Sequence, residues 1–152
     1  MTQPTPEQLA RYADQFNRSL TLKAFGARLS FPDQETVEVL IDPIRPEQRG
    51  GLGTDAVNGG VLAAMFDLVI GCTPALLDPT RRTATVELSM HFMRAVGGQR
   101  LRARAKVDRA GEVLCFSSAQ ILDEQGQVCA TAHGIARRSE QKWAGGDSPA
   151  IN

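Results

Sequence analysis

The chain has 152 residues, which suits a single domain. Basic and acidic side chains both number 17, and a net charge of zero argues against a generally basic nucleic-acid-binding protein. The three cysteines, Cys72, Cys115 and Cys129, form no C-x-x-C pair. We therefore expect buried free thiols in a reducing compartment and no metal site. Residues 1–16 lack the apolar core of a signal peptide, so we expect a cytoplasmic protein.

The N-terminal residues carry a helix-start motif. Thr5 is a capping residue, Pro6 suits the first helical position, and Gln8 stands three residues after the cap. The motif predicts an amphipathic covering helix over about 6–20. Its apolar face would carry Leu9, Tyr12, Ala13, Phe16 and Leu20.

Short strands are expected next at 27–31 and 36–41, separated by Pro32 and Asp33. Residues 42–57 carry two prolines, three glycines and several charges, so they are expected to form a loop. Because this loop directly precedes an apolar helix, it is a candidate lid or binding loop.

The segment 56–77 is apolar and contains a single carboxylate, Asp67. It predicts a central helix over about 59–76, which must be covered on most sides because it has no polar face. Asp67, Pro74 and the many small residues favour a buried helix of a soluble protein over a membrane span. A carboxylate in such surroundings is costly to bury unless it is paired or hydrogen-bonded, so Asp67 is a candidate functional residue.

The second half of the chain alternates apolar and polar residues, which predicts strands joined by short glycine-bearing connections. The expected strands are 84–94, 99–109, 112–122 and 127–137. We interpret them as consecutive hairpins of an antiparallel meander, although the pattern does not fix the strand order. The polar segment 139–152 is expected to be a mobile tail, in which Trp143 has no assigned role. An antiparallel sheet with one apolar helix predicts an α+β fold in which the sheet curves around the helix.

The spacing of Gly59 and Asp67 limits how the two residues can cooperate. The start of a helix presents unpaired N–H groups and partial positive charge, which can polarise a carbonyl group. Gly59 and Gly60 suit this role, although they also suit a simple tight turn. Eight residues of helix separate Gly59 from Asp67 by roughly 12 Å, too far for one carbonyl group to contact both. If both are catalytic, we expect them to act across two subunits with antiparallel helices; a structural carboxylate remains the alternative.

Three segments together resemble the hotdog-fold acyl-CoA thioesterases of the phenylacetate-degradation type. They are Asn58-Gly59-Gly60, Asp67, and Thr85–Val96 (TVELSMHFMRAV), and the resemblance covers about residues 25–138. It implies a hotdog fold with an antiparallel sheet wrapped around a long central helix, in one domain over 1–138. It further implies a homodimer with the active site across its interface, and a pairing of dimers into a homotetramer.

The resemblance also implies the site residues and the reaction, hydrolysis of an acyl-CoA thioester to a free acid and coenzyme A. The Gly59 amide would bind the thioester carbonyl, and Asp67 of the other subunit would be the nucleophile or the general base. Thr85 would place a hydroxyl near the attacking water. Asn58 stands where the family usually carries His, and it can donate a hydrogen bond or orient the helix start.

Binding of the coenzyme A thioester is also implied by the resemblance, with no other cofactor. The residues expected to contact the substrate are Gly60, Phe66, Arg94, Arg109, Gly111 and Arg137. Met65 and Leu68 would line the acyl pocket beside Phe66 and loop 42–57. The basic row Arg100, Arg102, Arg104 and Lys106 is expected to be a solvated strand face.

Two other functions remain open. A hotdog hydratase or dehydratase would use a histidine, but none lies near the helix start, and His91 and His133 are expected to be structural or surface residues. A non-catalytic acyl-CoA-binding protein is favoured by Asn58. No nucleic acid or membrane partner is expected.

Overall fold

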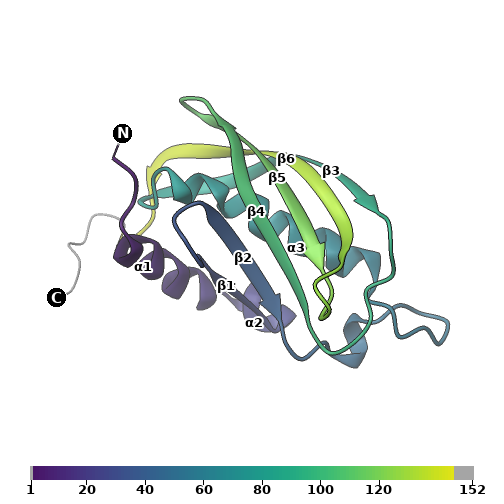
Figure 1. Ribbon diagram of the computed structural model, residues 1–152. Coiled ribbons are helices and arrows are strands. Elements are labelled where there is room, and N and C mark those ends of the chain that lie inside the picture. Colours follow the sequence, from purple (N-terminus) through teal and green to yellow (C-terminus); the bar gives the residue numbers. More distant parts are fainter. Residues whose placement is uncertain (1, 146–152) are drawn as a thin grey trace.

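The computed structural model describes residues 2–145, which form one curved six-stranded antiparallel sheet wrapped around a long helix (Figure 1). The strand order is β1-β2-β4-β5-β6-β3. The helices are α1 (Pro6–Asn17), α2 (Leu20–Phe25) and α3 (Gly59–Cys72), with 3-10 turns at Pro46–Gln48 and Thr73–Leu76. The strands are β1 (Ala27–Ser30), β2 (Thr36–Ile41), β3 (Arg81–Phe92), β4 (Leu101–Ala110), β5 (Leu114–Leu122) and β6 (Val128–Lys142).

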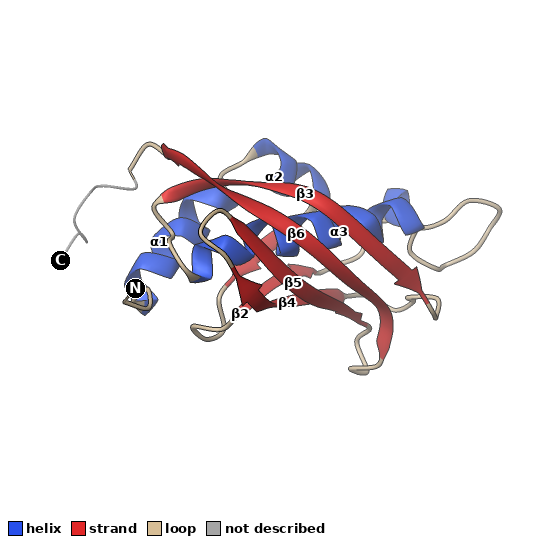
Figure 2. Cartoon of the chain, turned by 90° about the horizontal axis from the view of Figure 1, so that it is seen from above, coloured by secondary structure: helices blue, strands red, loops and turns tan. Residues whose placement is uncertain are grey.

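Helix α3 lies in the concave side of the sheet and supplies the centre of the core (Figure 2). Its buried side chains are Leu62, Met65, Phe66, Leu68, Val69, Ile70 and Cys72. The segment Gly59–Leu76 is apolar and long enough to cross a membrane, yet most of it is buried inside the protein as the core helix. The predicted central helix is therefore confirmed. Its last turn tightens to 3-10 because Pro74 has no N–H for the Ile70 carbonyl, which accepts instead from the Thr73 backbone N–H and from the Thr73 hydroxyl at 2.8 Å.

The predicted capping box at Thr5 and Gln8 is confirmed. The prediction of one helix through residue 20 is wrong, because α1 ends at Asn17. Ser19 caps a separate helix, α2, by accepting a hydrogen bond from the Leu22 amide. Leu20 consequently points outward and is 82% exposed, instead of completing the apolar face of α1.

The strands lie close to their predicted positions, but the predicted meander is wrong at its first connection. Strand β3 pairs with β6, and the chain then crosses to place β4 beside β2. The crossing segment is held against the loop before α3: Val57 donates to the Val96 carbonyl at 2.8 Å, and Ile44 to the Gln99 carbonyl at 2.6 Å. Backbone carbonyls of the crossing segment therefore bond to this loop, whereas the amides of Met93 and Arg94 donate to the Cys129 carbonyl of β6.

A β-bulge at Val86 changes the face that β3 turns toward α3. The β3–β6 register shifts between Thr85 and Glu87, and Val86 is 57% exposed. The alternation in 84–94 predicts that Ala84 faces the core and Thr85 faces outward. This prediction is wrong before the bulge, where Ala84 points outward and Thr85 faces the helix. After the bulge Leu88 is half-buried and packs on the core, as the alternation predicts.

Strand β6 continues to Lys142, so the prediction of a tail beginning at 139 is wrong for its first residues. Trp143 also packs against the core and donates its indole N–H to the Pro79 carbonyl at 2.6 Å. The remainder of the predicted tail, 146–152, lies outside the described residues. The three cysteines are free and buried, as predicted.

Candidate functional site

The start of α3 presents one unused amide. Asn58 caps the helix, and its side-chain oxygen accepts from the Gly60 amide at 2.8 Å. The Gly59 amide has no hydrogen-bond acceptor among residues 2–145, and Gly59 is exposed. Because the positive end of the helix dipole lies here, the Gly59 N–H is placed to bind a carbonyl oxygen or an anion.

Gln48 holds this helix start in place, and the sequence did not single it out. It is buried, and its backbone carbonyl accepts from the Asn58 amide at 2.9 Å. Its side chain donates to the Phe25 carbonyl at 2.7 Å and accepts from the Arg45 amide at 2.8 Å. A glutamine in a polar loop has no periodic pattern around it, so its burial could not be predicted.

The loop before α3 projects from the body of the protein (Figures 1 and 2). Arg49 fixes its base by donating to the backbone carbonyls of Asp55 at 2.7 Å and Gly98 at 2.8 Å. Leu52 at its tip is fully exposed and has a positive φ of 60°. The loop is thus a braced projection beside the Gly59 amide.

Asp67 lies exposed in the middle of α3, and its carboxylate has no hydrogen bond or ion pair with the described residues. Strand β3 brings two hydroxyls to this helix. Thr85 Oγ lies 3.5 Å from the Asp67 backbone oxygen, and Thr83 donates to the Gly71 carbonyl at 2.6 Å. Strand β3 therefore places the Thr85 hydroxyl against the backbone of Asp67 within one chain.

Gly59 and Asp67 belong to the same continuous helix, Gly59–Cys72. Their separation along its axis is therefore about 12 Å, at roughly 1.5 Å per residue. One chain does not bring the free amide and the carboxylate together.

One face of the chain is left open beside Asp67. On α3 it carries small residues one turn apart, Gly60 and Ala64. The adjacent strand β3 is an edge of the sheet, with exposed apolar side chains at Val86 (57%) and Phe92 (52%), and at Met93 (55%) directly after the strand. A long, apolar, unpaired edge is a template for another strand.

Of the six residues expected to contact the substrate, the three arginines and Gly111 lie at two different ends of the sheet. Arg109, Gly111 and Arg137 lie at the β4–β5 hairpin end of the sheet, where the Arg109 guanidinium stacks 4.8 Å from the centre of the Phe116 ring. Arg94 follows β3 at the other end, where its amide donates to the Cys129 carbonyl. The structure therefore brings three of the four together in one chain, and not the fourth.

Gly60 lies on the open face, but Phe66 and Met65 do not. Both side chains are completely buried in the core. The structure therefore does not place Phe66 where a ligand beside Asp67 would touch it.

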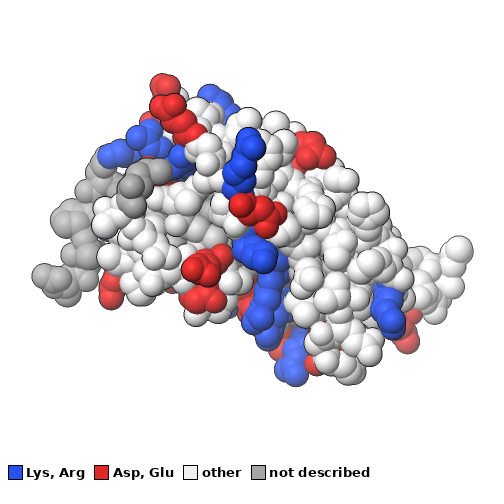
Figure 3. All heavy atoms as spheres, turned by 45° about the horizontal axis from the view of Figure 1, so that its top comes forward, with Lys and Arg blue, Asp and Glu red and all other residues white. Residues whose placement is uncertain are grey.

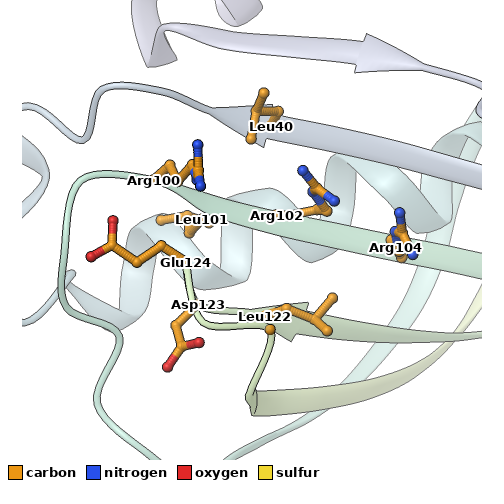
Figure 4. A pocket seen from close by; sticks show the side chains of 9 residues that line it. Leu40, Arg100, Leu101, Arg102, Arg104, Leu122, Asp123 and Glu124 are labelled. Atoms are coloured by element: carbon orange, nitrogen blue, oxygen red, sulfur yellow. The ribbon is translucent and has the colours of Figure 1, made fainter.

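The basic row of β4 lies on the outer face of the sheet, away from α3 (Figure 4). Glu38 on β2 pairs with Arg102 at 3.5 Å and Arg104 at 2.7 Å. Figure 3 shows basic side chains in a stripe with acidic ones beside it. His91 and His133 are also exposed on this face. These groups are solvated or paired, and they are separated from Asp67 by the sheet.

Cys72, one turn beyond Asp67, is not a nucleophile. Burial raises the pKa of its thiol to about 12, and the charge of Asp67 acts in the same direction. The Tyr12 hydroxyl lies 3.7 Å from its sulfur. A thiol that stays protonated inside the core is inert.

The family model described as the thioesterase superfamily matches residues 55–130, half of the chain. The matched segment includes the start of α3, Asp67 and strands β3 to β5. Among curated proteins, the Thermoplasma acidophilum protein named "Putative esterase Ta0293" is 26% identical over 113 residues, covering 74% of this chain and 83% of that protein.

Solved structures share the fold. Thioesterase HI1161 from Haemophilus influenzae has a TM-score of 0.77 at 15% identity, covering 91% of this chain and 95% of that one. PaaI of E. coli, from the phenylacetic acid degradation operon, has a TM-score of 0.78 at 17% identity, covering 91% of this chain and 99% of that one. These similarities confirm the predicted α+β hotdog fold, with its curled antiparallel sheet around a central helix.

Proposed function

This chain belongs to the thioesterase superfamily, and we propose that it hydrolyses acyl-CoA thioesters at a site shared by two subunits. The observation that carries the proposal is the pair formed by a free Gly59 amide and an unpaired Asp67 carboxylate on one helix. Each has the chemistry that thioester hydrolysis requires, and their separation requires a second copy to unite them.

The open face supports such a dimer. Two β3 edges can pair antiparallel about a twofold axis and hide the exposed Val86, Phe92 and Met93 side chains. The same axis would set the two α3 helices antiparallel, and the small residues of their open faces would permit close approach. With Gly59 opposite Asp67 of the partner subunit, two equal sites result.

In each proposed site, the thioester carbonyl accepts a hydrogen bond from the Gly59 amide. The amide and the helix dipole stabilise the negative charge that develops on this oxygen when the carbonyl carbon is attacked. Asp67 of the other subunit acts as the base that removes a proton from water or as the direct nucleophile. The Thr85 hydroxyl, next to Asp67, holds the water. Collapse of the intermediate breaks the carbon–sulfur bond and releases the acid and the coenzyme A thiol.

Asn58 is compatible with this role although it cannot titrate. Its side-chain oxygen is engaged by the Gly60 amide, which leaves its NH2 group as a second donor beside Gly59. The dimer axis would also bring Arg94 of one subunit toward the end of the sheet where the other carries Arg109 and Arg137. These guanidinium groups suit the phosphates of coenzyme A.

The test is hydrolysis of a panel of acyl-CoAs by the purified protein, measured as released thiol. Asp67→Asn should lower kcat by about 10²-fold or more while the protein remains a dimer. Glu87→Gln is the matched control, because Glu87 is an exposed carboxylate on the outer face of β3. Unchanged turnover in Asp67→Asn would remove Asp67 from the mechanism.

A second function is favoured by one observation, the amide side chain of Asn58 at a position where an imidazole is usual. The protein would then bind acyl-CoA without cleaving it. Calorimetric binding of an acyl-CoA that the wild-type protein leaves intact over hours would establish this alternative.

A further inference from the structure

A pocket of about 300 Å³ lies between α1, the start of β3 and Trp143. Tyr12, Phe16 and Trp143 supply three aromatic rings to its lining. Tyr12 stacks on Phe16 at 5.9 Å between ring centres, and it meets Trp143 edge-on at 6.3 Å. These contacts fix the rings, so the pocket is a preformed apolar surface. Its polar lining includes Gln15 and Arg81, and the Arg81 guanidinium is already held by Asp78 at 3.0 Å.

Two series of contacts, one along α3 and one along β3, connect this pocket to Asp67. Along α3, Cys72 lies five residues beyond Asp67, about 7.5 Å along the axis, and its sulfur contacts the Tyr12 hydroxyl. Along β3, Thr85 lies beside Asp67, and Thr83 lines the pocket two residues away, about 7 Å along the strand. Along both elements, the residue that contacts or lines the pocket therefore lies roughly 7 Å from the position of Asp67 or its neighbour Thr85.

We propose that this aromatic pocket receives the far end of the acyl group. The inference rests on the proposed function, because it takes the thioester carbonyl to lie beside Asp67. An acyl group must then extend about 7 Å beyond its carbonyl carbon to reach the rings, which selects medium-length or ring-bearing acyl groups and leaves acetyl groups without a contact. Tyr12, expected only on the apolar face of the covering helix, and Trp143, which had no assigned role, become residues that determine specificity.

Other cavities do not compete for this role. Two cavities of about 330 and 370 Å³ lie on the outer face of the sheet and are lined by basic residues of β4, such as Arg104. A third, of about 400 Å³, lies between α1 and β1. None of the three is lined by a residue of α3 or β3, so none is continuous with Asp67.

Trp143 offers a direct readout because it is the only tryptophan of the chain. The probes are coenzyme A thioethers, which bind without being hydrolysed: 8-bromooctyl-CoA, octyl-CoA and 3-bromopropyl-CoA. Bromine quenches indole fluorescence on contact. We expect saturable loss of Trp143 emission with 8-bromooctyl-CoA and none with the other two. Equal quenching by both brominated probes, or binding of 8-bromooctyl-CoA without quenching, would overturn the proposal.

Kinetics with a filled pocket provide the second arm. Gln15→Trp adds an indole at the exposed edge of the pocket. The control Arg18→Trp adds an indole three residues further along the chain, outside the pocket. We expect Gln15→Trp to lower kcat/KM for octanoyl-CoA about tenfold relative to acetyl-CoA, with no change of this ratio in Arg18→Trp. Hydrolysis without selective quenching would retain the proposed function and reject the pocket. Selective quenching without hydrolysis would retain the pocket and reject the enzyme.

Discussion

The hydroxyl oxygen of Thr85 lies 3.5 Å from the backbone oxygen of Asp67. This contact joins the edge strand β3 to the middle of α3, at the long limit of a hydrogen bond. The Thr85 hydroxyl therefore links the open edge of the sheet to the backbone of the residue that carries the free carboxylate.

Replacing Thr85 by Val removes this hydroxyl and keeps a branched side chain. We expect kcat to fall about tenfold, because the water beside Asp67 loses one hydrogen-bond partner. Thr85→Ser should keep most of the activity. The measurement is thiol release under saturating acyl-CoA, and equal losses in both variants would indicate a packing effect.

The Gly59 amide can be deleted with little disturbance of the helix. Gly59 is the first residue of α3, where proline is tolerated, and a Cβ there meets nothing within 4 Å. Gly59→Pro should lower kcat by about 10² to 10³, the typical effect of losing an oxyanion donor. Gly59→Ala retains the N–H and serves as the control. Circular dichroism should report intact helix content in both, and similar kinetics for the pair would exclude the amide from catalysis.

Mixed dimers test whether the site is shared. In a heterodimer of Asp67→Asn and Gly59→Pro subunits, a shared geometry leaves one site with both groups intact. Random mixing of the two inactive variants should then restore about one quarter of wild-type activity, because half of the dimers carry one active site. A site contained within one subunit predicts no recovery. Thiol release after unfolding and refolding the mixture, compared with each variant treated alone, distinguishes the two arrangements.

The dimer should depend on the edge of β3. Val86→Lys places a charge at the bulge, where pairing with a second β3 would bury it, so we expect monomers at micromolar concentration and loss of hydrolysis. Val113→Lys is the control, since Val113 is comparably exposed but precedes β5. Sedimentation velocity gives the oligomeric state and separates dimers from the tetramers expected from paired dimers. A dimeric Val86→Lys protein would place the interface elsewhere.

Alkaline pH should destabilise the protein through two buried acids. Burial raises the pKa of Tyr12 well above its usual range, and burial raises the pKa of Cys72 to about 12. Both groups hold their protons more tightly in the folded than in the unfolded state. The stability that these two protonated groups contribute is thus complete below about pH 8.5 and is lost as pH rises toward their folded pKa values. For Cys72, the free energy of unfolding should fall by on the order of 1.4 kcal/mol per pH unit.

Urea unfolding between about pH 8 and pH 10.5 checks this expectation. Cys72→Ala should lower stability at neutral pH through lost packing, but its free energy of unfolding should fall less steeply with pH. A slope identical to that of the wild type would show that Cys72 does not contribute to the pH dependence.

Local signals in the sequence were sufficient for much of the fold. The capping box at Thr5 and the apolar run around Asp67 depend only on nearby residues, and both predictions are confirmed. The same apolar run indicated that α3 needs covering on most sides. In the structure, a single chain covers all of it except the face around Asp67.

What could not be predicted depends on residues far apart in the chain. The alternation of apolar and polar residues along β3 is the same whether the strand pairs with β4 or with β6, so the strand order was left open. The bulge at Val86 and the packing of Trp143 follow from that pairing, and neither has a local motif. The break before Ser19 did have a signal, since serine favours a helix cap, but the apolar spacing of Leu20 suggested continuation.

The pairing of β3 with β6 also sets an order of events during synthesis. Phe92 pairs with Ala130 and Arg81 with Lys142, so β3 has no partner until the C-terminal strand has left the ribosome. Contacts between such distant segments form late because long loops must close first. Until then both edges of β3 are unpaired, and nascent chains could join through the wrong one. The strand that would unite two finished subunits is thus the one whose premature association the growing chain must avoid.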